Sequence, residues 1–125
     1  MAVAPLDPFE LPDWLGTEHV SWCADTALSD APRVAGTLRA RSGEQQLDLL
    51  AVDAVYPRQV CPDRERHDAH QAWQFGQVLI AFFDGRVTAA VPGVRFDANR
   101  ACEAIGRFAK AVGASAGNVT VSIQL

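Results

Sequence analysis

The segment VLIAFFDGRVTAAV, residues 78–91, decides the fold because it predicts a β-hairpin directly. Two apolar runs flank Asp84-Gly85, a pair suited to a tight turn in which both central residues take positive φ. Strict alternation gives the hairpin two faces. The expected core face consists of Val78, Ile80, Phe82, Val87, Ala89 and Val91. The second face is also apolar and consists of Leu79, Ala81, Phe83, Thr88 and Ala90, with Arg86 beside the turn.

Two amphipathic helices are expected on either side of this hairpin. The first covers residues 63–77 and has a narrow buried stripe of small residues together with Trp73. The second begins at the cap Asp97 and closes at Gly113, as helix start and stop signals indicate. Residues 119–125 then alternate between apolar and polar side chains, which predicts a half-buried final strand.

Three further strands are predicted upstream of the first helix. They cover residues 19–24, residues 33–41 and residues 44–56, and an N-terminal arm with a short helix (residues 1–17) precedes them. A turn at Ser42-Gly43 joins the second and third strands. This turn opposes Leu38 to Leu47 and Val34 to Ala51, so one face of the pair stays apolar.

These elements predict an α+β fold in a single domain, residues 1–125. The order is helix-βββ-α-ββ-α-β. Hairpin connections favour one mainly antiparallel sheet of five to six strands. We expect the two main helices to cover one face of it.

Composition narrows the classes of function. The net charge of −4 argues against a nucleic-acid partner, which needs a concentrated basic surface. No apolar run is long enough to span a membrane, and the first residues do not resemble a signal peptide. Three widely spaced cysteines make no complete disulfide framework. We therefore expect a cytoplasmic protein without a cofactor.

Two resemblances accompany these patterns. The run AHQAWQFGQVL (residues 69–79), with VPG (residues 91–93) and AIGRFAKAVGA (residues 104–114), resembles a family of small uncharacterised actinobacterial proteins. That resemblance implies no activity and no catalytic residues. The element order is similar to that of type III secretion chaperones and related small dimeric domains, although the final strand departs from that pattern. Fold alone does not imply function.

The first helix carries the densest polar cluster. Asp63, His67 and His70 share a narrow arc, because residues three and four apart lie on one helical face. Two imidazoles and a carboxylate suit a divalent metal such as zinc. We favour an ordinary solvated face without a metal, since this arc lies away from the buried stripe and metal sites usually draw ligands from several elements.

Asp53 is the second candidate. Alternation places it on the same face as Leu47 and Leu49, where burial raises a carboxyl pKa and makes an acid or base available. We favour the other interpretation, in which a bulge turns Asp53 outward or its carboxylate caps neighbouring amides, because alternation most often fails at strand ends. If Asp53 has an acid or base role, we expect a ligand pocket between the first helix and the sheet. Its residues would be Asp53, Tyr56, His67, His70 and Trp73.

The apolar second face of the hairpin suggests a different function. Two helices on one side leave it exposed, and monomers rarely expose a large apolar patch. A second copy, a protein partner, a ligand or the N-terminal arm must cover it. The first hypothesis is a non-enzymatic interaction or adaptor-like domain, homodimeric or bound to a protein partner. Its interface residues are Leu79, Ala81, Phe83, Arg86, Thr88 and Ala90. A small-molecule site or a modest metal-dependent enzyme is the alternative.

Overall fold

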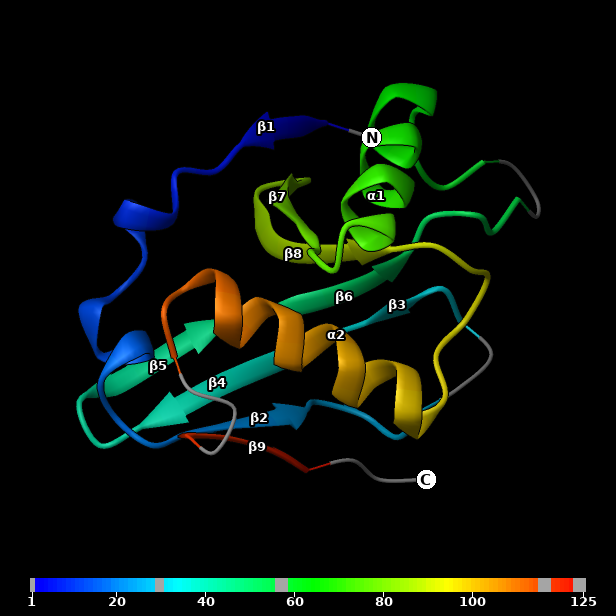
Figure 1. Cartoon of the computed structure of the whole chain (residues 1–125). Helices are drawn as coiled ribbons and strands as arrows, with labels where there is room; N and C mark the ends of the chain where they lie inside the picture. Colours follow the sequence, from blue (N-terminus) through cyan, green and yellow to red (C-terminus); the bar gives the residue numbers. More distant parts are fainter. Residues whose placement is uncertain (1, 29–30, 56–58, 115–117, 123–125) are drawn as a thin grey trace.

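The computed structural model describes residues 2–28, 31–55, 59–114 and 118–122. Within them the chain forms an α+β fold with two α-helices and two mixed sheets (Figure 1). The α+β class is confirmed. The expectation of one mainly antiparallel sheet was wrong, because the strands divide into a five-stranded and a four-stranded sheet and each contains a parallel pair.

The five-stranded sheet carries the 78–91 hairpin. Its strands are β1 (Val3–Pro5), β3 (Arg33–Val34), β6 (Asp48–Ala51), β7 (Leu79–Phe83) and β8 (Arg86–Val91). They lie in the order β1-β7-β8-β6-β3, with β6 and β8 parallel and the other neighbours antiparallel. The β7–β8 hairpin is confirmed: Phe83 pairs with Arg86, and Asp84 and Gly85 both have positive φ.

The four-stranded sheet lies beside it. Its strands are β2 (Val20–Ala24), β4 (Gly36–Ala40), β5 (Gly43–Gln46) and β9 (Val119–Ser122). They lie in the order β5-β4-β2-β9, and β9 runs parallel to β2. The predicted final strand therefore forms over residues 119–122, and residues 123–125 lie outside the described part.

One bent hairpin joins the two sheets. The predicted strand 33–41 divides into β3 and β4, and the predicted strand 44–56 divides into β5 and β6, so each half pairs in a different sheet. Leu38 pairs with Gln45 instead of Leu47, and Val34 pairs with Leu49 instead of Ala51. The expected register was thus wrong by two residues. A shift of two keeps every side chain on its expected face, because strand side chains repeat with period two.

The bend has a steric cause at Gly36. A Cβ atom there would lie 2.4 Å from the indole ring of Trp22, so only glycine lets the two strands approach this closely. The Trp22 Nε1–H donates to the Leu47 carbonyl at 2.9 Å, which satisfies a backbone acceptor left unpaired at the corner.

Asp48 fixes the same corner electrostatically. Its side chain is fully buried and accepts hydrogen bonds from Arg33 (2.8 Å), from Arg86 (2.6 and 3.0 Å) and from Gln46 (2.7 Å). A buried carboxylate is tolerated only when it is paired and hydrogen-bonded in this way. Arg86 and Gln46 come from different sheets, so the cluster ties the sheets together.

The two helices lie on opposite faces of the five-stranded sheet. Helix α1 (Asp63–Gln74) packs on β7 and β8, whereas α2 (Ala98–Ala111) contacts β8 and β9 (Figure 1). The Asp97 carboxylate caps α2 by accepting from the Arg100 amide, as predicted. Among the described residues, neither helix is long and apolar enough to cross a bilayer. Placing both helices on one face was wrong.

This arrangement seals the second face of the hairpin. Its side chains join Ala69 of α1 in a compact cluster, against which Val3 of β1 also packs. Phe83 is 0% exposed, and Ala81, Thr88 and Ala90 are buried as well. Leu79 is half-buried, and only Arg86 of the expected interface is exposed. The expectation of an exposed apolar face was therefore wrong, because α1 and the N-terminal strand cover it.

The N-terminal arm contributes more than the predicted short helix. Two 3-10 helices, η1 (Pro8–Glu10) and η2 (Asp13–Gly16), follow β1. Leu11 and Leu15 are buried in the main core beside α2, whereas Phe9 is 94% exposed.

Candidate functional site

A polar pocket of about 350 Å³ lies beside the beginning of α1. Asp53 follows β6 by two residues, and Gly93 follows β8 by two. Because β6 and β8 are parallel neighbours, their carboxyl ends meet at one edge of the sheet. Such edges are common places for ligand sites in sheets with helices on both faces. The lining residues are Asp53, Asp63, Arg66, His67 and His70.

Helix geometry gathers four of these side chains. Asp63, Arg66, His67 and His70 are spaced at i, i+3, i+4 and i+7, which places them on one face over two turns. An adjacent face of the helix is anchored by Ala69, which is fully buried against the sheet. The small side chain lets α1 approach the sheet closely enough for this face to reach Asp53.

The chemistry of the pocket centres on a contact between Asp53 and His70. The His70 Nε2 lies 2.9 Å from both carboxylate oxygens of Asp53. A carboxylate only accepts hydrogen bonds, so the proton of a neutral His70 ring is on Nε2. The lone pair is then on Nδ1. Asp53 therefore fixes the tautomer of His70 and leaves one ring nitrogen free to accept a proton.

Asp53 itself is held in the ionised form. Burial alone would raise its pKa, but the hydrogen bonds from His70 and from the Gly93 amide outweigh burial and lower the pKa below its ordinary value. The pKa is not raised, as an acid or base role through burial would require. The interpretation favoured from the sequence is confirmed in one respect, since Asp53 caps an amide: the Gly93 N–H donates to its carboxylate at 2.8 Å.

Gly93 completes the support of Asp53. The Asp53 amide donates to the Gly93 carbonyl at 2.8 Å, so the two residues bind each other twice. Gly93 has a φ of +115°, and a Cβ atom there would lie 3.3 Å from the Arg100 guanidinium. Both features favour glycine at this position. Arg100 also donates to the Pro92 carbonyl, which positions the loop from α2.

The pocket contains three of the five side chains expected from the sequence. Asp53, His67 and His70 come together as predicted. Trp73 does not line the pocket, because its ring lies 3.5 Å from the Arg107 guanidinium and packs toward the main core. Tyr56 lies outside the described residues.

The three side chains considered as metal ligands, Asp63, His67 and His70, do not form a metal site in the described part of the chain. No group of three histidine, cysteine or acidic side chains there is arranged to hold an ion. His70 turns its Nε2 toward Asp53, and Asp63 accepts a hydrogen bond from Gln59 at 2.7 Å. The side chains share a helical face, but they do not converge on one point.

The cysteines offer no nucleophile to this pocket. Cys61 is buried, and burial together with the negative charge of Glu65 raises its pKa to about 11. Cys102, on α2, is exposed but does not line this pocket. Thiol reactivity follows the thiolate fraction and accessibility.

Alkylation should therefore discriminate sharply between these two thiols. At pH 8 a thiol with this pKa is ionised in only about one molecule in a thousand, so iodoacetamide should label Cys102 and spare Cys61. Peptide mass spectrometry over a time course measures both rates. In concentrated urea the two rates should converge. Equal labelling in the folded protein would contradict the burial of Cys61.

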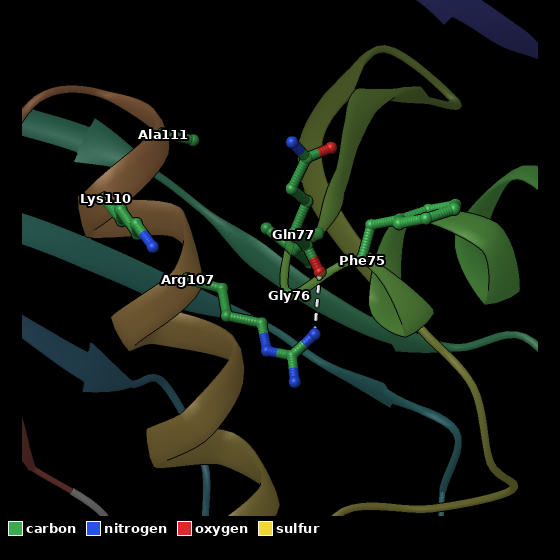
Figure 2. Close-up of a pocket in the computed structure, with 7 residues that line it drawn as sticks. Phe75, Gly76, Gln77, Arg107, Lys110 and Ala111 are labelled. Carbon is green, nitrogen blue, oxygen red and sulfur yellow. Dashed lines mark hydrogen bonds between the residues drawn. The ribbon is translucent and has the colours of Figure 1, made fainter.

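A second pocket, of about 360 Å³, lies between the end of α1 and the last turns of α2 (Figure 2). Arg107 crosses it and donates to the carbonyls of Trp73 (2.7 Å) and Gln77 (3.0 Å), while its other arm binds Glu103 (2.9 Å). These bonds satisfy carbonyls at the end of α1. We therefore assign this pocket a role in joining the helices.

Sequence reasoning missed two members of the site around Asp53. Arg66 was detectable, because it lies four residues before His70 on the same helical face. Gly93 was identified only as a turn glycine. Its contact with Asp53 joins positions 40 residues apart, and no local pattern reports such a contact.

Comparison with protein-family models, with curated proteins and with solved structures finds no match for this chain.

Proposed function

We propose that the pocket beside α1 binds a small polar molecule and that His70, oriented by Asp53, accepts a proton from it. The contact between His70 Nε2 and the Asp53 carboxylate carries this proposal. A histidine with one nitrogen held by a carboxylate and the other free has the arrangement of a general base. The His70 side chain is about half exposed (49%), so a ligand can reach it.

His70 is held in place on one side by Asp53 and by its helix, and its other side is open to solvent. Asp53 is fixed by its double contact with Gly93, and α1 is fixed by its packing on β7 and β8. Preorganised supports of this kind reduce the cost of orienting a catalytic group. The pocket opens beside His70 at the surface of α1, where His67 and Arg66 are also available.

The adaptor-like function expected from the sequence relied on the second face of the β7–β8 hairpin. That face is covered by α1 and β1. Within the described residues, the large apolar side chains that do remain exposed, Phe9, Val55, Phe75 and Val94, belong to four separate segments of the chain. Self-association remains a prediction, but the covered face of the β7–β8 hairpin is not available as its interface.

Diethyl pyrocarbonate tests the proposed base, because it reacts with an unprotonated imidazole nitrogen. The chain has three histidines, and the exposed His19 and His67 serve as internal references. We expect His70 to react severalfold faster than either reference. Asp53→Asn should remove that difference, because an amide no longer fixes the proton on Nε2. Peptide mass spectrometry measures each rate.

The matched control is Asp68→Asn, which makes the same chemical change on α1 at a residue that does not line this pocket. It should leave the rate at His70 unchanged. If His70 reacts no faster than His19 in the unmodified sequence, or if both asparagine variants behave alike, Asp53 does not make the free nitrogen of His70 more reactive and the proposal fails.

A further inference from the structure

We propose that the ligand of this pocket carries an oxyanion, either a carboxylate or a phosphate, and that Arg66 binds that group. The inference rests on the proposed function, because it names the class of ligand for the same pocket. It depends on different atoms, however, so that each can fail without the other.

The acceptors that line the pocket are already occupied within the chain. The Asp53 oxygens receive hydrogen bonds from His70 and Gly93. Asp63 receives one from Gln59. The Asp63 side chain is also 82% exposed, so water screens its charge. Without displacing an existing bond, a cationic ligand would therefore find only the remaining oxygen of the solvent-screened Asp63 carboxylate.

The donors, in contrast, are available. Within the described residues, the Arg66 guanidinium forms a loose ion pair with Asp63 Oδ1 at 3.7 Å, which is beyond hydrogen-bond distance, so its N–H donors keep room for a ligand. His67 has no side-chain hydrogen bond in the same part of the chain and is exposed. A guanidinium has five N–H donors in a planar fork that matches a carboxylate or phosphate.

The positions of these groups suggest how a ligand would lie. Arg66 precedes His67 directly and is one helical turn before His70, so all three reach the same hollow. An oxyanion bound by Arg66 and His67 places the rest of a small molecule next to the free nitrogen of His70. A molecule with an acidic proton near its anionic group fits this arrangement.

Titration with inorganic phosphate, and separately with acetate, tests the inference. Isothermal calorimetry measures the affinity, and NMR follows the Arg66 Nε–H signal. Arg66→Gln should weaken binding by about tenfold or more, because hydrogen bonds to charged groups contribute about 1.5–3 kcal/mol. Arg64→Gln is the control: it removes the same charge from the same helix, but Arg64 lines a different hollow beside β1 and β7.

Each outcome decides the matter. If only Arg66→Gln weakens binding, the site is an oxyanion site, and the tighter of the two probes identifies a phosphate or a carboxylate ligand. If neither anion binds, the pocket is not an oxyanion site and the inference fails. If both glutamine variants weaken binding equally, binding depends only on the net charge of the helix, and the inference fails as well. Binding that depends on Arg66 while Asp53→Asn leaves His70 unchanged would keep the anion site and reject the base.

Discussion

Replacing Phe83 with alanine should lower the free energy of unfolding by about 3–5 kcal/mol, the usual cost of truncating a buried phenylalanine. The Phe83 ring is 0% exposed and packs with Ala69 of α1 and with Val3 of β1. Its removal leaves a cavity between helix and sheet that neither neighbour can fill. Urea denaturation followed by circular dichroism measures the loss.

The chain provides matched controls for this change. Phe9 and Phe75 are 94% and 70% exposed, so Phe9→Ala and Phe75→Ala should each alter stability by less than about 0.5 kcal/mol. If Phe83→Ala left stability unchanged but altered the molecular mass in light scattering, the second hairpin face would be an exposed interface and the covering by α1 would be refuted.

Replacing Asp48 with asparagine should cost about 3 kcal/mol. Removing one partner of a buried ion pair typically costs 3–5 kcal/mol, and we expect the lower end because Arg33 and Arg86 both reach solvent. The matched control is Glu44→Gln, which breaks the exposed pair between Arg39 and Glu44. Exposed pairs contribute less than about 1 kcal/mol. Equal effects of the two changes would contradict the role of Asp48 at the corner between the sheets.

The same aspartate predicts how stability depends on pH. Burial acts to raise the pKa of Asp48, but hydrogen bonds from Arg86, Gln46 and Arg33 outweigh it and keep the pKa below its ordinary value of 3.8. A carboxyl whose pKa is lowered by folding stabilises the protein above the unfolded pKa. That contribution disappears as the pH falls through the folded pKa. The difference between the unmodified protein and Asp48→Asn should therefore be constant near neutrality and shrink below about pH 3.8.

Local chemistry in the sequence was enough to predict several elements. The β7–β8 hairpin formed as expected because Asp84-Gly85 selects its own turn. The cap Asp97 and the apolar stripe that follows it were enough to define α2. In each case the deciding interaction joins residues a few positions apart, so the local sequence is enough to predict the element.

The division into two sheets was not predictable in the same way. It depends on Trp22 occupying the space above Gly36 and on Asp48 collecting donors from both sheets. In the sequence, Gly36 looks like any strand glycine and Asp48 like any polar strand residue. Their roles depend on partners that are distant in the chain. The alternating pattern continues unchanged through the bend, which is why one long hairpin was expected.

The candidate site shows the same distinction. Sequence periodicity placed His67 and His70 on one face of a helix and identified Asp53 as unusual at the end of a strand. Only the tertiary structure decided that α1 lies on the face opposite α2, because both faces of the β7–β8 hairpin are apolar and the pattern does not say which helix covers which. That choice buried the expected interface and brought His70 to Asp53. The reason is physical: periodicity fixes the side of an element on which a side chain lies, whereas its partner depends on packing between segments distant in the chain.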